Sequence, residues 1–278
     1  MTNPDPGPVV QRILIGAELR AARETRNVTS GAATEALGWY SGKLSKIEQG
    51  DMPISDKDLA KVVALLDIDD TRVDALRSLA TEARRKLPPN RVPGWAAKYV
   101  HLFHAAKEVR VWNGDTFPGT VQTVDYARAT LAQAVKVAAT EVDRMAEDRA
   151  KRVERIMAAD RPRLWVAVGE EALHREVGGR ATLRAQLEHV RKIAELPNIT
   201  IQVVPFAGGA HASHGVSFSI TTLIEGRHGV VYLEGLSGSD YLGREHVGVY
   251  TLTFDHLMAA ALSPRETMAL LDRRIAEL

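Results

Sequence analysis

The segment Leu37–Gly50, LGWYSGKLSKIEQG, decides how the first part of the chain folds. Gly38 ends one apolar run, and a short polar stretch follows in which Leu44 and Ile47 have the spacing of one buried helix face. The opposite face carries small and polar residues, namely Gly42, Lys43, Lys46 and Gln49. The pattern predicts a short helix that follows a tight turn and ends at Gly50.

Helical patterns continue on both sides of this segment. Ile15, Leu19 and Ala22 recur at offsets of four and three, which is typical of an amphipathic helix. Capping or acidic residues mark further helix starts at Thr29–Ser30, Ser55 and Asp70–Thr71. The sequence therefore predicts five helices and no strands over residues 8–86.

A proline-rich stretch separates this region from the rest. LPPNRVPG (Leu87–Gly94) contains three prolines, which a helix does not continue through. We expect residues 87–94 to be a linker between an all-α domain (8–86) and a second domain (95–278). Residues 1–7 are polar and rich in proline, and we expect a disordered tail there.

Beyond the linker, helical and strand-like patterns alternate. Helices are expected at about 95–107, 123–136, 141–159, 180–195, 246–261 and 264–277. Strands rich in Val, Ile, Thr and aromatic residues are expected at 108–112, 164–168, 200–204, 216–223 and 229–234. The predicted fold class is thus two domains, with an α+β domain containing a mixed sheet after the five-helix domain.

Composition narrows the function classes. The chain has 278 residues and no cysteine, which excludes disulfides, thiol catalysis and cysteine-ligated metal sites. No apolar run is long enough to span a membrane and no leader is recognisable, so we expect a cytoplasmic, nucleoid-associated protein without a membrane partner. Residues 1–66 carry eight basic and eight acidic side chains, so a nucleic-acid site depends on where charges lie.

The segment Leu37–Gly50 has the chemistry of a DNA-reading helix. A second helix after a tight turn can enter the major groove, where lysine contacts guanine or phosphate and glutamine pairs with adenine. On the residues alone, a small helical bundle with a merely solvated polar face remains an equal alternative.

Val28–Gly50, VTSGAATEALGWYSGKLSKIEQG, resembles the helix-turn-helix of the xenobiotic-response-element and phage-repressor family. The resemblance covers Leu-Gly at the turn, Ser-Lys-Ile-Glu in the third helix and the final glycine. It implies an ion pair between Arg23 and Glu48 that fixes the recognition helix. The candidate DNA-binding residues are Arg20, Arg26, Ser30, Ser41, Gly42, Lys43, Ser45, Lys46 and Gln49.

Three positions depart from that family's pattern. Ser30 stands where a glutamine is usual, and Tyr40 replaces the serine that usually caps the third helix, which leaves Ser41 as the expected cap. Gly31 lies inside the second helix at a cost of about 1 kcal/mol relative to alanine. We therefore expect weaker base readout and a greater reliance on dimerisation.

The second region resembles an effector domain of unknown biochemical function that follows this helix-turn-helix in actinobacterial regulators of development and secondary metabolism. The matching stretches include FPGTVQTVDYAR (Phe117–Arg128), RPRLWVAVGEEALHREVGG (Arg161–Gly179), PNITIQVVPFAGGAHASHG (Pro197–Gly215) and FDHLMAAALSP (Phe254–Pro264). Members are often encoded beside a small acidic partner protein. The resemblance implies regulation and protein partnership, and it brings no catalytic site.

Several residues of the second region have alternative interpretations. His211 and His214 have the spacing of two metal ligands, and His228, Glu225 or Glu234 would be further ligands. A turn-forming loop is the favoured interpretation, because no dense cluster of ligating residues surrounds the two histidines. Glu170 and Glu171 are either paired carboxylates or, as we favour, the acidic start of a helix. Val177–Arg180 offers a weak anion site.

Two further groups of residues in the second region have the chemistry of a binding site for a partner. Arg149, Arg152 and Arg155 form either a patch for an acidic protein or, as favoured, part of a solvated helix. The aromatic residues after the linker are interpreted as core or interface anchors, with a small-ligand pocket as the alternative; they are Trp95, Tyr99, Phe103 and Trp112.

These observations favour a sequence-specific transcriptional regulator that binds double-stranded DNA as a homodimer on a palindromic operator, without catalysis, metal or cofactor. The second domain would supply dimerisation and partner or ligand sensing. An antitoxin-like interaction module, acting mainly through a small acidic partner, is the main alternative. A hydrolase in the second domain is a third.

Overall fold

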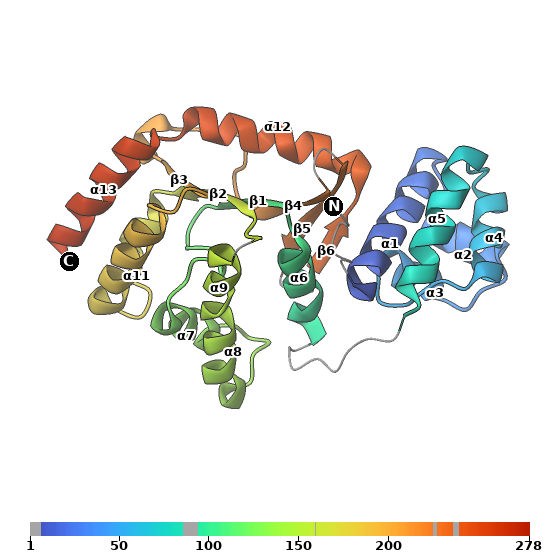
Figure 1. Cartoon of the computed structure of the whole chain (residues 1–278), viewed down its shortest axis with the longest axis horizontal. Coiled ribbons are helices and arrows are strands. Elements are labelled where there is room, and N and C mark those ends of the chain that lie inside the picture. Colours follow the sequence, from blue (N-terminus) through green and yellow to red (C-terminus); the bar gives the residue numbers. More distant parts are fainter. Residues whose placement is uncertain (1–6, 86–93, 159, 225–226, 236–238) are drawn as a thin grey trace. The chain divides into compact units, whose positions relative to one another are not determined.

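A computed structural model describes residues 7–85, 94–158, 160–224, 227–235 and 239–278 (Figure 1). Between residues 7 and 85 the chain forms five helices and no strand. They are α1 (Pro8–Thr25), α2 (Ser30–Ala36), α3 (Lys43–Glu48), α4 (Asp56–Leu65) and α5 (Asp70–Ala83). The prediction of a five-helix region is confirmed.

The later part of the chain is α+β, as predicted. Its helices are α6 (Gly94–Ala105), α7 (Val124–Ala132), α8 (Val142–Ala150), α9 (Arg152–Met157), α10 (Glu171–His174), α11 (Arg180–Ile193), α12 (Arg244–Ala260) and α13 (Pro264–Glu277). Its strands are β1 (Glu108–Asn113), β2 (Arg163–Gly169), β3 (Ile199–Val204), β4 (Phe218–Ile224), β5 (Arg227–Glu234) and β6 (Ser239–Leu242). They form one six-stranded mixed sheet in the order β3-β2-β1-β4-β5-β6.

Three elements differ from the sequence prediction. The helix expected over 141–159 is divided at Lys151 into α8 and α9, a break that no glycine or proline marks. The strand expected from residue 216 begins at Phe218, and Val216 is exposed. Strand β6 was not predicted, because four residues are too few to show an alternating pattern.

The described residues form two compact units. One contains Met1–Lys107 and Ile220–Tyr250, and the other contains Glu108–Ser219 and Thr251–Leu278. The domain limits expected from the sequence (8–86 and 95–278) stay a prediction. Residues 1–6 of the expected tail (1–7) and residues 87–93 of the expected linker (87–94) lie outside the described residues.

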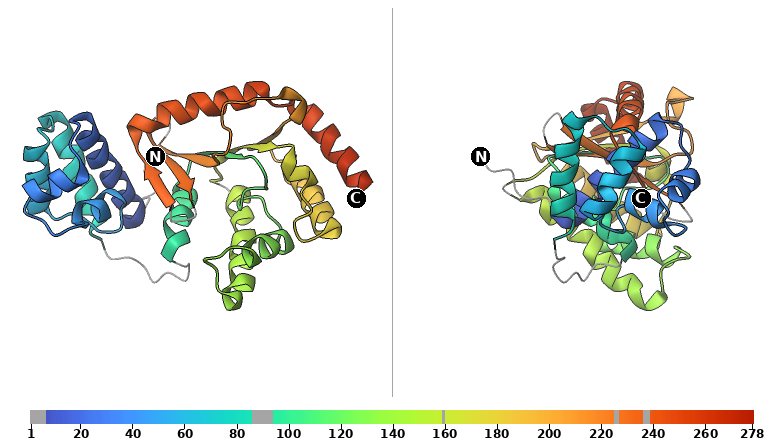
Figure 2. Two further views of the ribbon diagram at one scale, coloured as in Figure 1. Left: turned by 180° about the vertical axis from the view of Figure 1, so that it is seen from behind. Right: turned by 90° about the vertical axis from the view of Figure 1, so that its right-hand side faces the viewer.

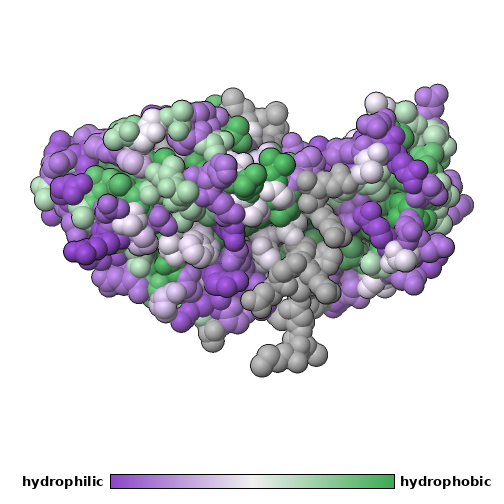
Figure 3. All heavy atoms as spheres, turned by 90° about the horizontal axis from the view of Figure 1, so that it is seen from above, coloured by the Kyte–Doolittle hydropathy of each residue, from purple (hydrophilic) through white to green (hydrophobic). Residues whose placement is uncertain are grey.

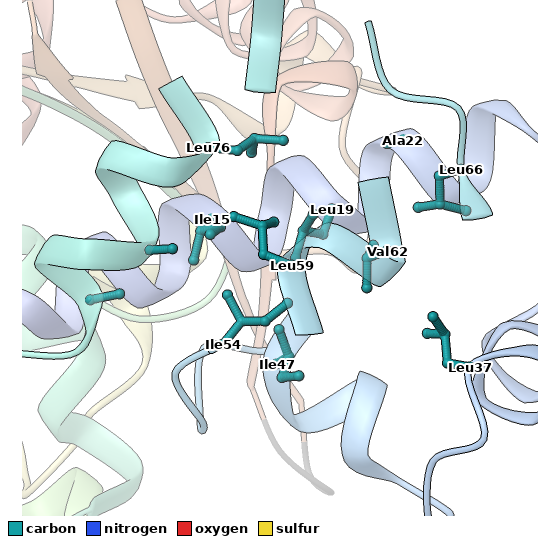
Figure 4. Close-up of a cluster of buried hydrophobic side chains, with 12 residues drawn as sticks. Ile15, Leu19, Ala22, Leu37, Ile47, Ile54, Leu59, Val62, Leu66 and Leu76 are labelled. Carbon is teal, nitrogen blue, oxygen red and sulfur yellow. The ribbon is translucent and has the colours of Figure 1, made fainter. Parts of the chain in front are cut away.

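In the first unit, one face of α1 forms the core of the five-helix region. Ile15 and Leu19 of α1 are almost completely buried and belong to one cluster with Ile47 of α3, with Ile54, which precedes α4, and with Leu59 of α4 (Figure 4). Apolar residues at offsets of three and four along α1 and α4 thus pack around the buried side chain of Ile47 in α3. The short helix α3 is held by this core rather than by its own helix propensity.

A second cluster lies against α1 in the same unit. Val10, Ile13 and Leu14 pack with Leu102 of α6 and with strand residues. The strand residues are Leu223, Val230, Tyr232 and Tyr241. α1 is therefore buried on two sides, which explains why ten of its residues are buried.

In the second unit, β1, β2 and β3 are parallel, with Val111 beside Val166 and Val166 beside Ile201. The views in Figures 1 and 2 show α7, α8, α9 and α11 on one face of these strands and the C-terminal part of α12 on the other. Buried Gln186 of α11 donates to Val121 O at 2.8 Å and accepts from Thr123 N at 2.8 Å. This amide fixes the loop that leads into α7.

The surface is mixed in character. Figure 3 shows hydrophobic residues interspersed among hydrophilic ones on the face where α12 lies. No helix in the described part of the chain is both long enough and apolar enough to cross a membrane.

Gly16 brings α1 and α3 into close contact, which predicts a large effect of a single methyl group. A Cβ at Gly16 would lie 2.4 Å from Ile47 O and 2.6 Å from Glu48 O, both backbone atoms. We expect Gly16→Ala to lower the free energy of unfolding by about 1–3 kcal/mol, despite alanine's better helix propensity. Chemical denaturation followed by circular dichroism measures the change.

Gly31→Ala is the matched control, because nothing lies within 4 Å of a Cβ at Gly31. We expect it to leave stability unchanged or to raise it by up to about 1 kcal/mol. Equal effects of the two substitutions would contradict the close contact between α1 and α3.

Candidate nucleic-acid interface

Two glycine-terminated helices form the candidate site. Thr29 Oγ1 accepts a hydrogen bond from Ala32 N at 3.2 Å and caps the start of α2. At its end, Gly38 has a φ of 65°, Gly38 N donates to Glu35 O and Trp39 N donates to Thr34 O. These two bonds are those of a Schellman motif, in which glycine supplies the left-handed residue. α2 therefore stops where the turn must begin.

The start of α3 differs from the sequence prediction. The residue at its N-cap is Gly42, with a φ of 84°, and no side chain caps the helix. Ser41, expected to be the cap, is one position too early and is exposed. Because glycine adopts this left-handed conformation without strain, the chain turns into α3 without a hydroxyl cap.

The inner face of α3 is fixed by burial. Leu44 and Ile47 are 2% and 1% exposed, as their spacing predicted. Gly50 ends the helix with a φ of 71°, and a Cβ there would lie 3.0 Å from backbone atoms of Ile13 in α1. Glycine at this position is thus required both by conformation and by the close approach of α1.

A buried ion pair joins α3 to α1. Arg23 donates from Nε to Glu48 Oε1 at 2.7 Å and from its Nη2 to Glu48 Oε2 at 2.8 Å. Arg23 also donates to Val28 O at 2.9 Å, just before α2. The hydrogen bond to Glu48 raises the pKa of Arg23 further above its ordinary value. These are the two residues for which the resemblance implies an ion pair.

The outer face of α2–α3 presents a small set of polar groups. The side chains of Ser41, Lys46 and Gln49 are exposed. Ser30 Oγ and Ser45 Oγ lie 3.1 Å apart, so a hydroxyl pair joins α2 to α3. Lys46 is in no ion pair within the described part of the chain. This face offers one uncompensated cation, one amide and several hydroxyl groups.

Lys43, placed on the outer face by its spacing, is engaged with a neighbouring helix. Its Nζ donates to Asp58 Oδ2 at 2.8 Å and lies 4.3 Å from the centre of the Trp39 ring. Burial raises the pKa of Asp58, but hydrogen bonds from Lys43 and Ser55 outweigh it and keep the pKa below its ordinary value. Asp58 therefore stays ionised and holds the Lys43 ammonium.

The two predicted arginine contacts also have carboxylate partners. Arg20 Nε donates to Glu24 at 2.9 Å and its Nη1 lies 3.8 Å from Asp240. Arg26 donates to the side chain of Asp67 at 2.8 Å. The candidate cations Arg20, Arg26 and Lys43 are thus each paired with a carboxylate.

One residue that the sequence analysis did not identify contacts the end of this site. Lys98 of α6 donates from Nζ to Gln49 O at 2.6 Å and lies 2.7 Å from Asp51. No local pattern connects Lys98 with α3, because the two are 49 residues apart in sequence.

In the second unit, the histidine loop has the arrangement of a turn. The rings of His211 and His214 stack at 4.2 Å, and His214 Nε2 accepts from His211 N at 3.1 Å. Burial, and then the neighbouring His214, lower the pKa of His211. Among the described residues, no group of three or more metal-ligating side chains is present. Glu225 lies outside the described residues, as does the side chain of His228, and Glu234 is exposed.

The other candidates of the second region have structural partners. Glu170 accepts from Phe206 N at 2.7 Å, and Glu171 begins the four-residue helix α10 beside Arg175. Arg149 donates to Gln122 at 3.1 Å and Arg155 to Asp160. Gly178 and Gly179 have positive φ values before α11.

The predicted aromatic anchors are buried in two separate units. Phe103 and Trp112 are each 1% exposed, and the partly buried Tyr99 packs against Tyr232, with ring centres 4.7 Å apart and the rings tilted by 41°. The side chain of Trp95 lies outside the described residues.

Comparison with known protein families identifies both regions. Residues 14–76 match a helix-turn-helix domain, and residues 96–273 match a domain of unknown function (DUF5753). The chain belongs to the DUF5753 family. No curated protein and no solved structure matches it. The predicted combination of an N-terminal helix-turn-helix with a C-terminal domain of unknown function is confirmed, and a helix-turn-helix domain indicates DNA binding.

The buried ion pair yields a stability prediction. Arg23→Met leaves Glu48, which is 6% exposed, as an unpaired buried charge. We expect a loss of about 3–5 kcal/mol in the free energy of unfolding, measured by chemical denaturation. The matched control is Arg20→Met, which removes a partly exposed pair and costs about 0–1 kcal/mol. Equal losses for both variants would contradict a special role of the Arg23–Glu48 pair.

Proposed function

We propose that this chain is a sequence-specific DNA-binding transcriptional regulator that binds a palindromic operator as a homodimer. The observation that supports this most is the outer face of α3. Lys46 and Gln49 project from a helix whose inner face is held by Leu44, Ile47 and the Arg23–Glu48 pair. A short helix fixed in this way presents its polar side chains in a reproducible direction, which base recognition requires.

In this proposal the candidate residues have two roles. Lys46 and Gln49 contact base edges, since lysine pairs with guanine and glutamine pairs with adenine. The small residues at the helix start, Ser41 and Gly42, allow close approach to the DNA backbone. Arg20, Arg26, Lys43, Ser30 and Ser45 position the domain on phosphates.

Dimerisation follows from the size of the reading surface. One such domain buries about 600–1,000 Å² on DNA, which is small for specific binding. Two copies related by a two-fold axis double the contacts and place the recognition helices in half-sites about 34 Å apart. We propose that residues 8–86 bind DNA and that residues 95–278 dimerise and sense a ligand or partner, without catalysis.

Removing the two outward side chains tests the assigned face. We expect Lys46→Ala/Gln49→Ala to weaken binding to a selected operator about 10-fold to 1,000-fold and to relax its base preference, because each base contact contributes about 1–3 kcal/mol. Gel shift at a fixed salt concentration measures both quantities. Lys57→Ala on α4, which also removes one exposed lysine, is the control and should bind nearly as the wild type does. Unchanged affinity and preference in the double variant would show that another face is used.

A substitution of Asp58 tests the proposed contact of Lys43 with DNA through an expected gain in affinity. Asp58→Asn removes the carboxylate that holds Lys43 and leaves that ammonium available to a phosphate. We expect a several-fold higher affinity for DNA and a salt slope steeper by up to about one unit. Titrations at several salt concentrations measure the slope. An affinity equal to or lower than that of the wild type, in a folded variant, would show that Lys43 does not contact DNA.

An antitoxin-like interaction module, acting mainly through a small acidic partner, is the second candidate. The observation that favours it is the carboxylate pairing of Arg20, Arg26 and Lys43, which reduces the cationic surface available to DNA. Affinity capture from the native host followed by sequencing of bound DNA separates the two functions. A stoichiometric small protein without enriched DNA sites would support the module, and enriched palindromic sites would support the regulator.

A further inference from the structure

The C-terminal end of α3 leaves a backbone acceptor that the helix itself does not satisfy. Gly50 N donates to Ile47 O at 3.0 Å and Asp51 N donates to Lys46 O at 2.8 Å, so these two carbonyl groups are used by the Schellman motif. Met52 N also donates to Lys46 O, at 3.2 Å. The carbonyl of Gln49, the last residue of this turn, has no partner within the motif.

Lys98 supplies that partner from a distant part of the sequence. Its Nζ donates to Gln49 O at 2.6 Å and lies 2.7 Å from Asp51 Oδ1. An ammonium group here satisfies the carbonyl oxygen and also lies at the negative end of α3. Lys98 therefore stabilises the turn through both a hydrogen bond and an ion pair.

Lys98 is itself held in place. Its side chain is only 17% exposed, and its ammonium lies 5.4 Å from the centre of the Tyr241 ring. Tyr241 is buried beside Tyr232, with ring centres 5.3 Å apart, and Tyr232 packs against Tyr99 of α6. The side chain of Lys98 thus extends from α6 beside the Tyr241 ring, and its ammonium group ends at the turn that follows α3. A freely moving surface lysine would not have these contacts.

The position of Asp51 gives Lys98 an electrostatic role as well. Asp51 follows Gln49 by two residues, and its side chain is half-exposed at the end of the proposed DNA-reading helix. An uncompensated carboxylate there would repel the phosphates of bound DNA. Lys98 neutralises it from the protein side.

We infer that Lys98 is a positioning residue for DNA recognition, which couples α6 and the β6 tyrosine of the DUF5753 region to the recognition helix. The inference rests on the proposed DNA-binding function. Lys98 lies inside the region that matches the domain of unknown function, whereas its acceptor Gln49 lies inside the helix-turn-helix match. A change in α6 or at Tyr241 that moves Lys98 alters the end of α3 directly.

The test combines a structural readout in the free protein with DNA binding. In Lys98→Met we expect the amides of Asp51 and Met52, which close the turn, to exchange with solvent about tenfold faster. We expect the Kd for the selected operator to rise about fivefold to twentyfold. Lys192→Met on α11 is the control, because it removes one exposed positive charge while leaving the turn intact. It should change neither quantity.

A second substitution separates the two effects of Lys98. In Lys98→Met/Asp51→Asn the repelling carboxylate is absent, so affinity should recover in part. Amide exchange should stay fast because Gln49 O still lacks its donor. Lys98→Arg, which keeps the charge and can donate to Gln49 O, should bind DNA nearly as the wild type does.

Failure of this inference differs from failure of the proposed function. If the wild-type protein selects no DNA sequence, the proposed function is wrong and the positioning role falls with it, while the exchange data still report on the contact. If the wild type selects a sequence, unchanged amide exchange or an unchanged Kd in Lys98→Met overturns the inference alone.

Discussion

The burial of α1 on two sides is the constraint on which the rest of the first unit depends. One side carries Ile15 and Leu19 into the core of the five-helix region, and the other carries Val10 and Ile13 into the cluster with α6 and the strands. A helix in this position cannot rotate without removing apolar side chains from one core or the other. Its small residues are constrained as well, because a Cβ at Gly243 would lie 2.6 Å from Ala17 Cβ.

This arrangement gives α3, the proposed recognition helix, a rigid support. α3 has only six residues and is too short to be stable by itself. It is held to α1 by the close approach at Gly16, by the burial of Ile47 and by the Arg23–Glu48 hydrogen bonds. Because these contacts act on the inner face, the exposed side chains of Lys46 and Gln49 contribute little to folding. They are consequently available for recognition, which is the physical basis of the proposed function.

Local patterns predicted most of the elements but not their long-range partners. The buried positions Leu44 and Ile47 followed from helical spacing, and the α+β class followed from apolar runs bounded by turn residues. Lys43 was placed outside by the same spacing, yet a lysine reaches several ångströms and here bends toward Asp58, fifteen residues away. The contact of Lys98 with Gln49 depends on how α6 packs, which periodicity does not encode. The order of the six strands was likewise outside the reach of local patterns.

The ion pairs around α2–α3 determine how the proposed DNA binding would be distributed between charge and base contacts. Each of Arg20, Arg26 and Lys43 already has a carboxylate partner, so contacting a phosphate means exchanging one anion for another. Such an exchange yields less net free energy than contact by an unpaired cation, because the carboxylate left behind lies close to the phosphate. Lys46 and Gln49 carry no such cost in the described structure. In the proposed function, such a domain would gain little free energy from contact with DNA in general. Its binding would depend on the few proposed base contacts of α3 and on a second copy.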